Sequence, residues 1–461
     1  TSSPAATLID SASASATSIS VDGLTNGTTY YFRITALDGD GYESIYSAEV
    51  SGAPEYRGPV WYVDDNSGSG SHEGSPGDPF REIQDAIDVA STGDTVKVLP
   101  GTYDRPDDQE LSFHDSENNT AKNIVLMSRD GAATTFLDGE NKRVFELVDD
   151  TDTTLHIIGF TITASNGAEH GSENQGAIVK AVGNNYWDGN TQQEVYVNAG
   201  ATFKNCVFTM FDSGDLESQS DWEDVAVYID AATIVFDNCE FTNITVDYSN
   251  ASNNESFGGA IRVGNPYGGG SSAGIVHLNR CEINHVTITT SSPANLYGGA
   301  IFVGGNSAND LTLTNTIVAD NLVFYNNSDT SYPPSGGALK TRGGHVKIIN
   351  STIVNNELRT VTNYTSEGSA ISAEDWNSEG DSPHITMFNS IVHGNTTTTD
   401  FLSNGGVSYQ LNQIQINDWS DGVETNFSYS IIAGDDDFGG EEILNLEPEF
   451  LDSTYALHPR S

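Results

Sequence analysis

The stretches SFGGAIRVGN (256–265) and LYGGAIFVGG (296–305) carry nearly the same ten residues, forty positions apart. Shorter copies read QGAIV (175–179), GGALK (336–340) and GSAIS (368–372). A pattern that recurs in fixed order predicts a repeat architecture, in which the chain turns the same corner again and again. The paired glycines before Ala-Ile suit a corner at which a Cβ atom would clash.

A second pattern follows these copies at a variable distance. It reads FKNCVF (203–208), FDNCEF (236–241), LNRCEI (278–283), LTNTIV (313–318), IINSTI (348–353), MFNSIV (387–392) and YSII (429–432). The aligned small residues are Cys206, Cys239, Cys281, Thr316, Ser351, Ser390 and Ser430, and Asn precedes five of them. Because the units are strand-length and lack long amphipathic helices, we expect solenoid rungs about 4.8 Å apart, with equal positions stacked in columns.

The composition narrows the possible partners. Of 461 residues, 65 are acidic and 18 basic, which gives a net charge of −47 and argues against nucleic acid or an anionic membrane as partner. The three cysteines fall in one column of the repeat, so we interpret them as buried free thiols and not as a disulfide framework. No apolar stretch is long enough to span a membrane.

The first 56 residues differ in style from the rest. GLTNGTTYYFRITALD (23–38) alternates around aromatic residues and ends at a turn. This text resembles the last strands of a fibronectin type III module, so we assign residues 1–56 to the C-terminal part of such a module. The earlier strands are missing from this sequence, which predicts an open sheet edge that other copies or chains can cover.

The stretch WYVDDNSGSG (61–70) with GSPGDPFREIQDAIDVASTGDTVKVLPGTY (74–103) resembles the opening of right-handed parallel β-helix proteins of the pectate-lyase-like type. A helix over 78–91, with Asp78 as N-cap and Pro79 at its first position, would plug the end of the solenoid. We therefore predict an all-β right-handed parallel β-helix over residues 57–461. Its last rung is expected near 443–461, because NLEPEFLDSTYALHPRS (445–461) is similar to the last rung of bacterial surface β-helix proteins. The resemblance implies a secreted, extracellular or bacterial cell-surface protein.

The Gly-Ala-Ile strands bring rare bases together. The second residue after Ala is Val179, Arg262, Phe302, Lys340 or Ser372, and the fourth includes Arg342 and Glu374. If these positions share an outward face, Lys340 and Arg342 project together, with Glu374 beside Arg342 and Arg262 about 10 Å away.

This set of bases has two interpretations. In a polysaccharide lyase, Lys340 would be the catalytic base and Arg342 or Arg262 the carboxylate clamp, with His345 close in sequence. The alternative is a surface salt-bridge ladder, in which each pair is worth about 0–1 kcal/mol. The catalytic motifs of the known β-helix lyases are not intact in this sequence.

Aromatic residues give a second candidate for sugar binding. Trp187, Trp376 and Trp419 all fall in the connection that follows the first strand of a unit. Three flat rings on one side of the coil, with Glu374 nearby, would form a platform for sugar faces. The alternative is that these rings pack inserted loops onto the coil.

Two acidic runs are candidate calcium sites. One is DSGDLESQSDWED (212–224), with Asp212, Asp215 and Asp221, and the other contains Asp435, Asp436 and Asp437. Loops dense in Asp and Gly can supply the oxygen ligands of Ca²⁺. Solvated acidic loops are the alternative.

The sequence leaves two functions open. The first is a non-catalytic extracellular module of a larger secreted or surface protein that binds carbohydrate or serves as an adhesin or structural stalk. The alternative is a secreted polysaccharide lyase that acts on an acidic, uronate-containing glycan by β-elimination. Whether the protein is an enzyme therefore stays open at this point.

Overall fold

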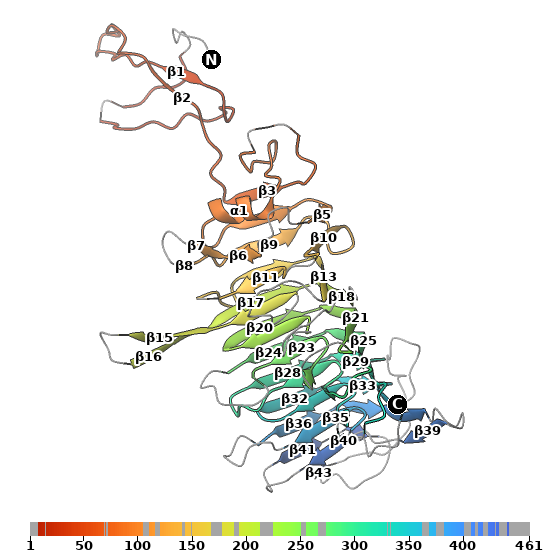
Figure 1. Ribbon diagram of the computed structural model, residues 1–461. Coiled ribbons are helices and arrows are strands. Elements are labelled where there is room, and N and C mark those ends of the chain that lie inside the picture. The colour runs from red at the N-terminus through yellow and green to blue at the C-terminus, as the bar shows by residue number, and fades with distance from the viewer. Residues whose placement is uncertain are drawn as a thin grey trace, which may run out of the picture.

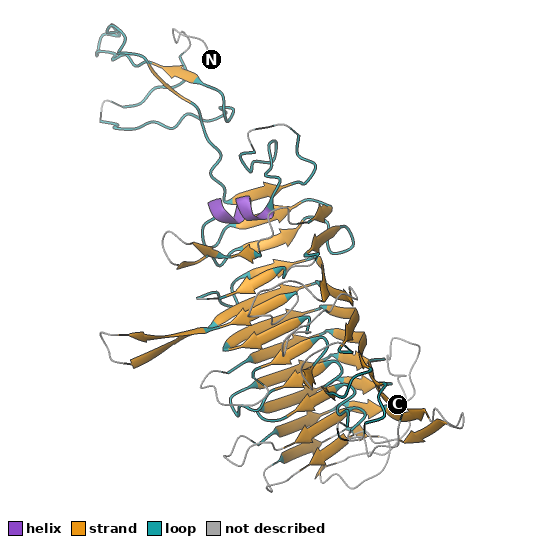
Figure 2. Ribbon diagram, in the orientation of Figure 1, coloured by secondary structure: helices purple, strands orange, loops and turns teal. Residues whose placement is uncertain are grey.

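The computed structural model shows an elongated stack of short strands, with a small separate unit at its N-terminal end (Figure 1). The helix lies at the end of the stack that faces this unit (Figure 2). The structure describes residues 8–441, except 14, 69, 71, 105–109, 116–119, 141–142, 149, 167–177, 189–192, 213–224, 250–254, 266–272, 330, 332, 362–367, 375–381, 401–406, 411–413, 418–422, 429 and 433–439. No helix in this part of the chain is long and apolar enough to cross a membrane.

Three sheets form the stack, and successive coils add a strand to the first, the second and the third sheet in turn. The first sheet contains β3 (Val60–Val63), β4 (Thr95–Val98), β9 (Val125–Ser128), β12 (His156–Ile158), β17 (Ala199–Lys204), β20 (Ala232–Asp237), β24 (Ile275–Asn279), β28 (Asp310–Thr314), β32 (His345–Ile349), β36 (His384–Phe388), β41 (Glu424–Ser428) and β43 (Gly440–Glu441). The second contains β5 (Gly101–Tyr103), β10 (Thr135–Asp138), β13 (Thr161–Asn166), β18 (Val207–Asp212), β21 (Glu240–Asp247), β25 (Glu282–Thr290), β29 (Ile317–Ala319), β30 (Leu322–Tyr325), β33 (Thr352–Val354), β34 (Glu357–Thr360), β37 (Ile391–His393), β38 (Thr396–Asp400), β39 (Val407–Gln410) and β42 (Ile431–Ile432). The third contains β6 (Leu111–Ser112), β11 (Phe145–Leu147), β14 (Val179–Val182), β19 (Val227–Asp230), β23 (Ile261–Val263), β27 (Ile301–Val303), β31 (Leu339–Thr341), β35 (Ile371–Glu374) and β40 (Ile414–Asn417).

Strands in these sheets pair in parallel, apart from the antiparallel pair β38 and β39. Smaller two-stranded sheets are β1 (Tyr30–Phe32) with β2 (Val50–Gly52), β7 (His114–Asp115) with β8 (Thr120–Ala121), β15 (Asn184–Asp188) with β16 (Gln193–Val197), and β22 (Glu255–Phe257) with β26 (Asn295–Tyr297). This topology confirms the predicted all-β parallel β-helix.

Equal positions of successive coils stack, as the repeat predicts. In the third sheet, Arg262 pairs with Phe302 on the next strand, and Phe302 pairs with Lys340. The QGAIV copy is one residue out of step, because Lys180 shares this column and Val179 does not. The expected place of Val179 is therefore wrong by one residue, and its side chain lies in the core.

Phenylalanine side chains stack in the core where the second pattern repeats. The rings of Phe203 and Phe236 lie 5.4 Å apart, and those of Phe208 and Phe241 lie 4.6 Å apart and almost parallel. These residues are the first and last letters of FKNCVF and FDNCEF. Each buried ring stabilises the stack by roughly 1.5–3 kcal/mol through removal of apolar surface from water.

The small-residue column lies inside the coil, at the corner between the first and second sheets. Cys206, Cys239 and Cys281 are free and buried, with exposed fractions of 1–3%. Further along the column, the backbone N–H of Thr316 donates to the Ser351 hydroxyl at 3.1 Å, and the same bond recurs on the following coils. The predicted column of buried free thiols is confirmed.

The backbone conformation explains why asparagine precedes five of the small residues. Five of these residues have φ between 48° and 56°, the left-handed region that asparagine tolerates better than most residues: Asn205, Asn238, Asn315, Asn350 and Asn389. Side-chain amides also bond from coil to coil, and Asn238 Nδ2 donates to Asn205 Oδ1 at 2.8 Å. Asparagine therefore both permits the corner and links the coils.

A second asparagine ladder, which we did not predict, lies buried within the second sheet, between β29 and β30 and between the equivalent strands of the next two coils. Asn321, Asn356 and Asn395 have exposed fractions of 0–1%. Asn321 donates to Asn356, and Asn356 to Asn395, both at 2.8 Å. Each amide also donates to a backbone carbonyl of the preceding coil, so this ladder satisfies polar groups within the core.

The capping helix α1 (Ile83–Val89) is shorter than predicted. Its N-cap is Glu82, and Asp78 does not cap it. Phe80 instead forms a parallel bridge to Val63, with a hydrogen bond from Phe80 N to Tyr62 O at 2.9 Å. The pairing with β3 holds residues near Phe80 extended, so the helix begins later, and Ile83 and neighbouring apolar side chains still bury against the first coil.

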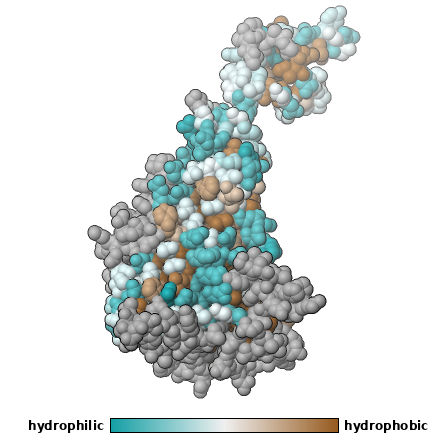
Figure 3. All heavy atoms as spheres, turned by 90° about the vertical axis from the view of Figure 1, so that its right-hand side faces the viewer, coloured by the Kyte–Doolittle hydropathy of each residue, from teal (hydrophilic) through white to brown (hydrophobic). Residues whose placement is uncertain are grey.

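The N-terminal unit contains β1 and β2, which pair in antiparallel fashion. Apolar surface is exposed on it (Figure 3). Its exposed apolar side chains include Ile34 at 74% and Ile45 at 92%. A two-stranded sheet with an uncovered apolar surface is marginal by itself in water. The assignment of this unit to a fibronectin type III module stays a prediction.

Candidate functional site

The predicted bases lie on the outer face of the third sheet. Arg262 and Lys340 alternate with core residues along their strands and therefore point away from the core. The structure nevertheless buries them: the exposed fractions are 1% for Arg262 and 0% for Lys340 and Arg342. The shared face is confirmed, but the expectation that these bases project into solvent is wrong.

An aromatic cover explains this burial. Phe257 on β22 and Tyr297 on β26 form a separate apolar cluster with Phe302 on the outer face of β27. The Arg342 guanidinium lies 4.3 Å from the centre of the Tyr297 ring, and the Arg262 guanidinium lies 5.3 Å from that of Phe257. Such cation–π contacts are stronger when they are desolvated. The small β22–β26 sheet thus covers the bases on the outer face of the solenoid and excludes solvent from them.

Carboxylates compensate the buried charges. Lys340 Nζ lies 3.1 Å from Glu374 Oε2 and donates to Ser372 Oγ at 3.0 Å. Arg342 Nε lies 3.7 Å from the same carboxylate, and Arg342 also approaches Glu255 at 4.0 Å. The predicted proximity of Glu374 to Arg342 is confirmed. The ion pairs of this cluster therefore link neighbouring strands of the third sheet and attach the β22–β26 sheet to the coil.

His345 lies apart from the bases. It begins β32 in the first sheet, whereas Lys340 lies on β31 in the third. The glycines Gly343 and Gly344 turn the chain between the two sheets, and His345 is exposed, with its ring 4.9 Å from that of His384. Closeness in sequence does not bring His345 to the cluster.

Most of the other predicted site residues fall outside the described residues. Trp376 and Trp419 do, and so do Asp215, Asp221, Asp435, Asp436 and Asp437. Trp187 lies on β15, paired with Glu194 on β16, and Asp212 ends β18. Among the described residues, no group of three or more His, Cys, Asp and Glu side chains is arranged to hold a metal ion. The calcium and tryptophan predictions stay predictions.

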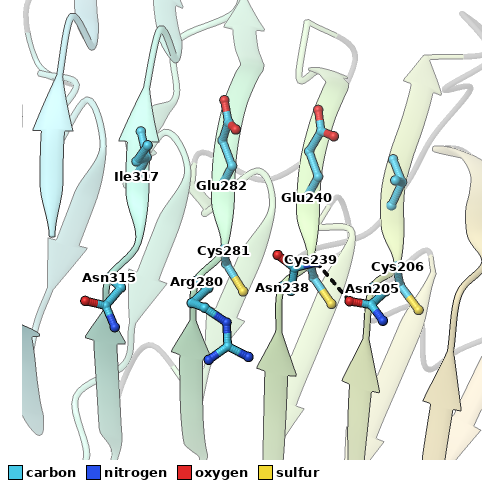
Figure 4. Close-up of a pocket in the computed structure, with 11 residues that line it drawn as sticks. Asn205, Cys206, Asn238, Cys239, Glu240, Arg280, Cys281, Glu282, Asn315 and Ile317 are labelled. Atoms are coloured by element: carbon cyan, nitrogen blue, oxygen red, sulfur yellow. Dashed lines mark hydrogen bonds between the residues drawn. The ribbon is translucent and has the colours of Figure 1, made fainter. Parts of the chain in front are cut away.

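An accessible pocket of about 410 Å³ lies elsewhere, at the corner between the first and second sheets. Asparagines of the left-handed column line it together with Arg280, Glu240 and Glu282 (Figure 4). Arg280 takes the asparagine position in its coil, also with positive φ, and forms an ion pair with Asp237. The pocket thus offers amide, carboxylate and guanidinium groups to solvent in one place.

Glu240 and Glu282 are the chemically distinctive pair of this pocket. They are register partners on β21 and β25, and their side chains run side by side (Figure 4). Neighbouring strands lie about 4.8 Å apart. Burial, and secondly the charge of Glu282, raise the pKa of Glu240, while a hydrogen bond with Thr242 and the charge of His285 oppose the shift. Asn284 Nδ2 donates to Glu282 Oε1 at 2.6 Å and so orients this carboxylate.

The sequence contained a signal for this pair. Two consecutive units carry Cys-Glu at the same position, Cys239-Glu240 and Cys281-Glu282. The cysteines form a column of the repeat, and a column of carboxylates one residue further on follows by the same logic. Alternation then places the glutamates outside the coil when the cysteines lie inside it.

No family model matches the chain, and no curated protein matches it in sequence. Among solved structures, it is similar to a rhamnogalacturonan lyase, with 12% identity, a TM-score of 0.32, and coverage of 84% of this chain and 85% of that one. It is also similar to a family 28 exopolygalacturonase from Yersinia enterocolitica, with 12% identity, a TM-score of 0.23, and coverage of 92% and 84%. At these identities and TM-scores the likenesses do not bear on what this chain binds or catalyses.

Proposed function

We propose that the protein is an extracellular parallel β-helix that binds a neutral polysaccharide at the corner pocket. The observation that carries this proposal is the pocket itself, where polar side chains from successive coils converge on an opening of about 410 Å³. The extracellular location rests on the resemblance of residues 58–103 to the opening of secreted β-helix proteins.

The lining suits sugar hydroxyl groups. The asparagine amides Asn205, Asn238 and Asn315 offer both donors and acceptors, and Glu240 and Glu282 offer acceptors. A repeating pocket edge matches a repeating ligand, because each coil presents the same kind of group about 4.8 Å further on. The net charge of −47 and the two carboxylates disfavour a polyanionic chain at this place.

A uronate lyase centred on Lys340 is less well supported by the geometry. Lys340 and Arg342 are completely buried, so the β22–β26 cover would have to move before either base reached a substrate. Their carboxylate partners, Glu374 above all, already occupy the place that a uronate would take. Binding at the open pocket needs no such movement.

The carboxylate pair favours hydrolysis as a second candidate function. Retaining glycosidases use two carboxyl groups about 5–5.5 Å apart. Here Glu240, whose pKa is raised, would donate its proton to the glycosidic oxygen as the bond to C1 breaks, and the Glu282 carboxylate, held by Asn284, would attack C1 to form an ester. A water, deprotonated by Glu240, would then attack C1 and release Glu282.

A glycan panel distinguishes these functions. The full chain is incubated with neutral and uronate polysaccharides, and three quantities are followed: bound protein in affinity gels, new reducing ends, and ultraviolet absorbance of unsaturated product. Variants are Glu240→Gln and Glu282→Gln. Glu357→Gln serves as the matched control, because Glu357 lies on the same second sheet outside the pocket.

Retention by a neutral glycan that both pocket variants weaken at least tenfold, with the control unchanged, is the expected result. New reducing ends that disappear in either variant would establish the hydrolase. Unsaturated product from a uronate polymer, lost on Lys340→Met, would establish the lyase and overturn the pocket proposal. Equal retention of the wild-type chain and of all variants by the neutral glycan would also overturn the pocket proposal.

A further inference from the structure

The outer face of the first sheet carries a row of titratable side chains unrelated to the corner pocket. Each member begins its strand, and register pairs each with the next: Asp310 with His345, His345 with His384, and His384 with Glu424. The residues that follow the first three, such as Val346 and Ile385, are buried in the core. Alternation therefore directs the row outward, toward solvent.

The two histidine rings lie close together, and a carboxylate lies beside that of His384. Their ring centres lie 4.9 Å apart, with a tilt of 47° between the ring planes. His384 Nδ1 lies 3.0 Å from Glu424 Oε2, while His345 is exposed and the His384 side chain is 41% exposed. An Nδ1–H that donates to a carboxylate fixes the tautomer, so that Nε2 of His384 carries the lone pair.

This is the arrangement in which carboxylates orient histidine ligands of metals. We propose that His345 and His384 bind a single divalent transition-metal ion, with Glu424 as a positioning residue. Imidazole nitrogens suit Zn²⁺, Ni²⁺ and Cu²⁺, whereas Mg²⁺ and Ca²⁺ prefer oxygen ligands. Water completes the coordination, because the site has two protein ligands and lies open to solvent.

The charges around the pair are compatible with a cation. Asp310, the carboxylate at the other end of the row, is already paired with Lys347, whose Nζ lies 2.6 Å from Asp310 Oδ2. Lys347 therefore points along the sheet toward β28, and Glu424 adds a negative charge on the opposite side. The overall charge of −47 also raises the local concentration of cations.

Titration calorimetry of the full chain with Ni²⁺ tests the proposal. An excess of Mg²⁺ in the buffer occupies the many surface carboxylates, so that binding through imidazole stands out. Variants are His345→Ala, His384→Ala and Glu424→Gln. His277→Ala is the matched control, because His277 is an exposed histidine on the same sheet, outside this row. Circular dichroism verifies that each variant is folded.

We expect one Ni²⁺ per chain, with affinity at least tenfold weaker in either histidine variant and unchanged in the control. Loss of the orienting carboxylate should weaken binding by about tenfold or more. Cu²⁺ should give an electron paramagnetic resonance spectrum with coupling to two imidazole nitrogens, and to one in either histidine variant. Absence of binding to the wild-type chain, or equal binding by the double variant His345→Ala/His384→Ala, would overturn the proposal.

Discussion

Lys340 Nζ lies 3.1 Å from Glu374 Oε2, although no part of Lys340 is exposed to solvent. The two residues come from neighbouring strands of the third sheet and meet beneath the aromatic cover of Phe257 and Tyr297. A charge in such a place is tolerated only when it is paired. The cluster that the sequence marked as a candidate active site is therefore also a structural element of the fold.

Loss of the shared carboxylate should destabilise the protein. Glu374→Ala leaves Lys340 and Arg342 without their common partner, and removal of one member of a buried pair costs about 3–5 kcal/mol. Urea unfolding of wild type, Glu374→Ala and the control Glu357→Ala measures the effect. If Glu374→Ala unfolds at the same urea concentration as wild type, the ion pair between Lys340 and Glu374 does not contribute to stability.

The buried asparagine ladder should be sensitive to a single change. Asn356→Ala removes the donor to the Val318 carbonyl and to Asn395, and the acceptor for Asn321. Each buried partner left unsatisfied costs about 1–3 kcal/mol.

Asn426→Ala is the control for the ladder, because Asn426 is exposed on β41. Thermal unfolding should show a clear loss for Asn356→Ala and almost none for Asn426→Ala. Similar small shifts for both variants would show that the ladder is dispensable.

The left-handed corner should distinguish glycine from a β-branched residue. Asn238 has a φ of 56°, which glycine adopts freely and valine does not. Asn238→Val should therefore be less stable than Asn238→Gly by about 1–2 kcal/mol. Both variants lose the amide bond to Asn205, so the difference between them in urea unfolding isolates the backbone. Equal stability of the two variants would contradict the corner conformation.

The pH dependence of stability should report the carboxylate pair. The pKa of Glu240 is raised in the folded state, so the folded chain holds this proton more tightly than the unfolded chain does. Its stabilising effect is present below the unfolded value of about 4.3 and is lost as the pH rises through the folded pKa.

Compared with Glu240→Gln, wild type should therefore lose relative stability as the pH rises from about 4 toward neutrality. The measurement is the difference between the two urea midpoints across this range. A constant difference would mean that Glu240 titrates alike in both states. Glu282→Gln should reduce the slope in the wild-type background, because its charge contributes to the shift.

Much of the fold could be predicted because the same letters recur at the same places. Cys206, Cys239 and Cys281 identified a column, and the column required stacked coils. The helix start was missed because Pro79 and Asp78 are also compatible with an extended segment, and the pairing of Phe80 with β3 decided between the two. Such pairing between distant segments is not visible in local sequence.

The site was harder to predict than the fold. Alternation indicated that Lys340 and Arg342 leave the core, but not that β22 and β26 cover them. Phe257 and Tyr297 are the second residues of the copies at 256–265 and 296–305, but nothing in the local pattern says that their strands fold back over the third sheet. The Cys-Glu dipeptides at 239–240 and 281–282 contained the necessary information, and the second asparagine ladder likewise repeats five residues after Thr316, Ser351 and Ser390. With 18 basic residues against 65 acidic ones, a cluster of bases stands out in this sequence and a pair of glutamates does not.

The register that brings Glu240 beside Glu282 can be tested by cross-linking. The native cysteines are first replaced with serine, which the same column already carries at Ser351, Ser390 and Ser430. Glu240→Cys is then combined with Glu282→Cys in one protein and, as control, with Asn284→Cys in another. Register partners lie about 4.8 Å apart between Cα atoms, within the range that a disulfide spans.

Mass spectrometry of peptides from the oxidised, folded proteins measures both linkages. We expect a disulfide between positions 240 and 282 in high yield and little between 240 and 284. A preference for 240–284, or no linkage in either protein, would contradict the stacking from which the pocket and its proposed function follow.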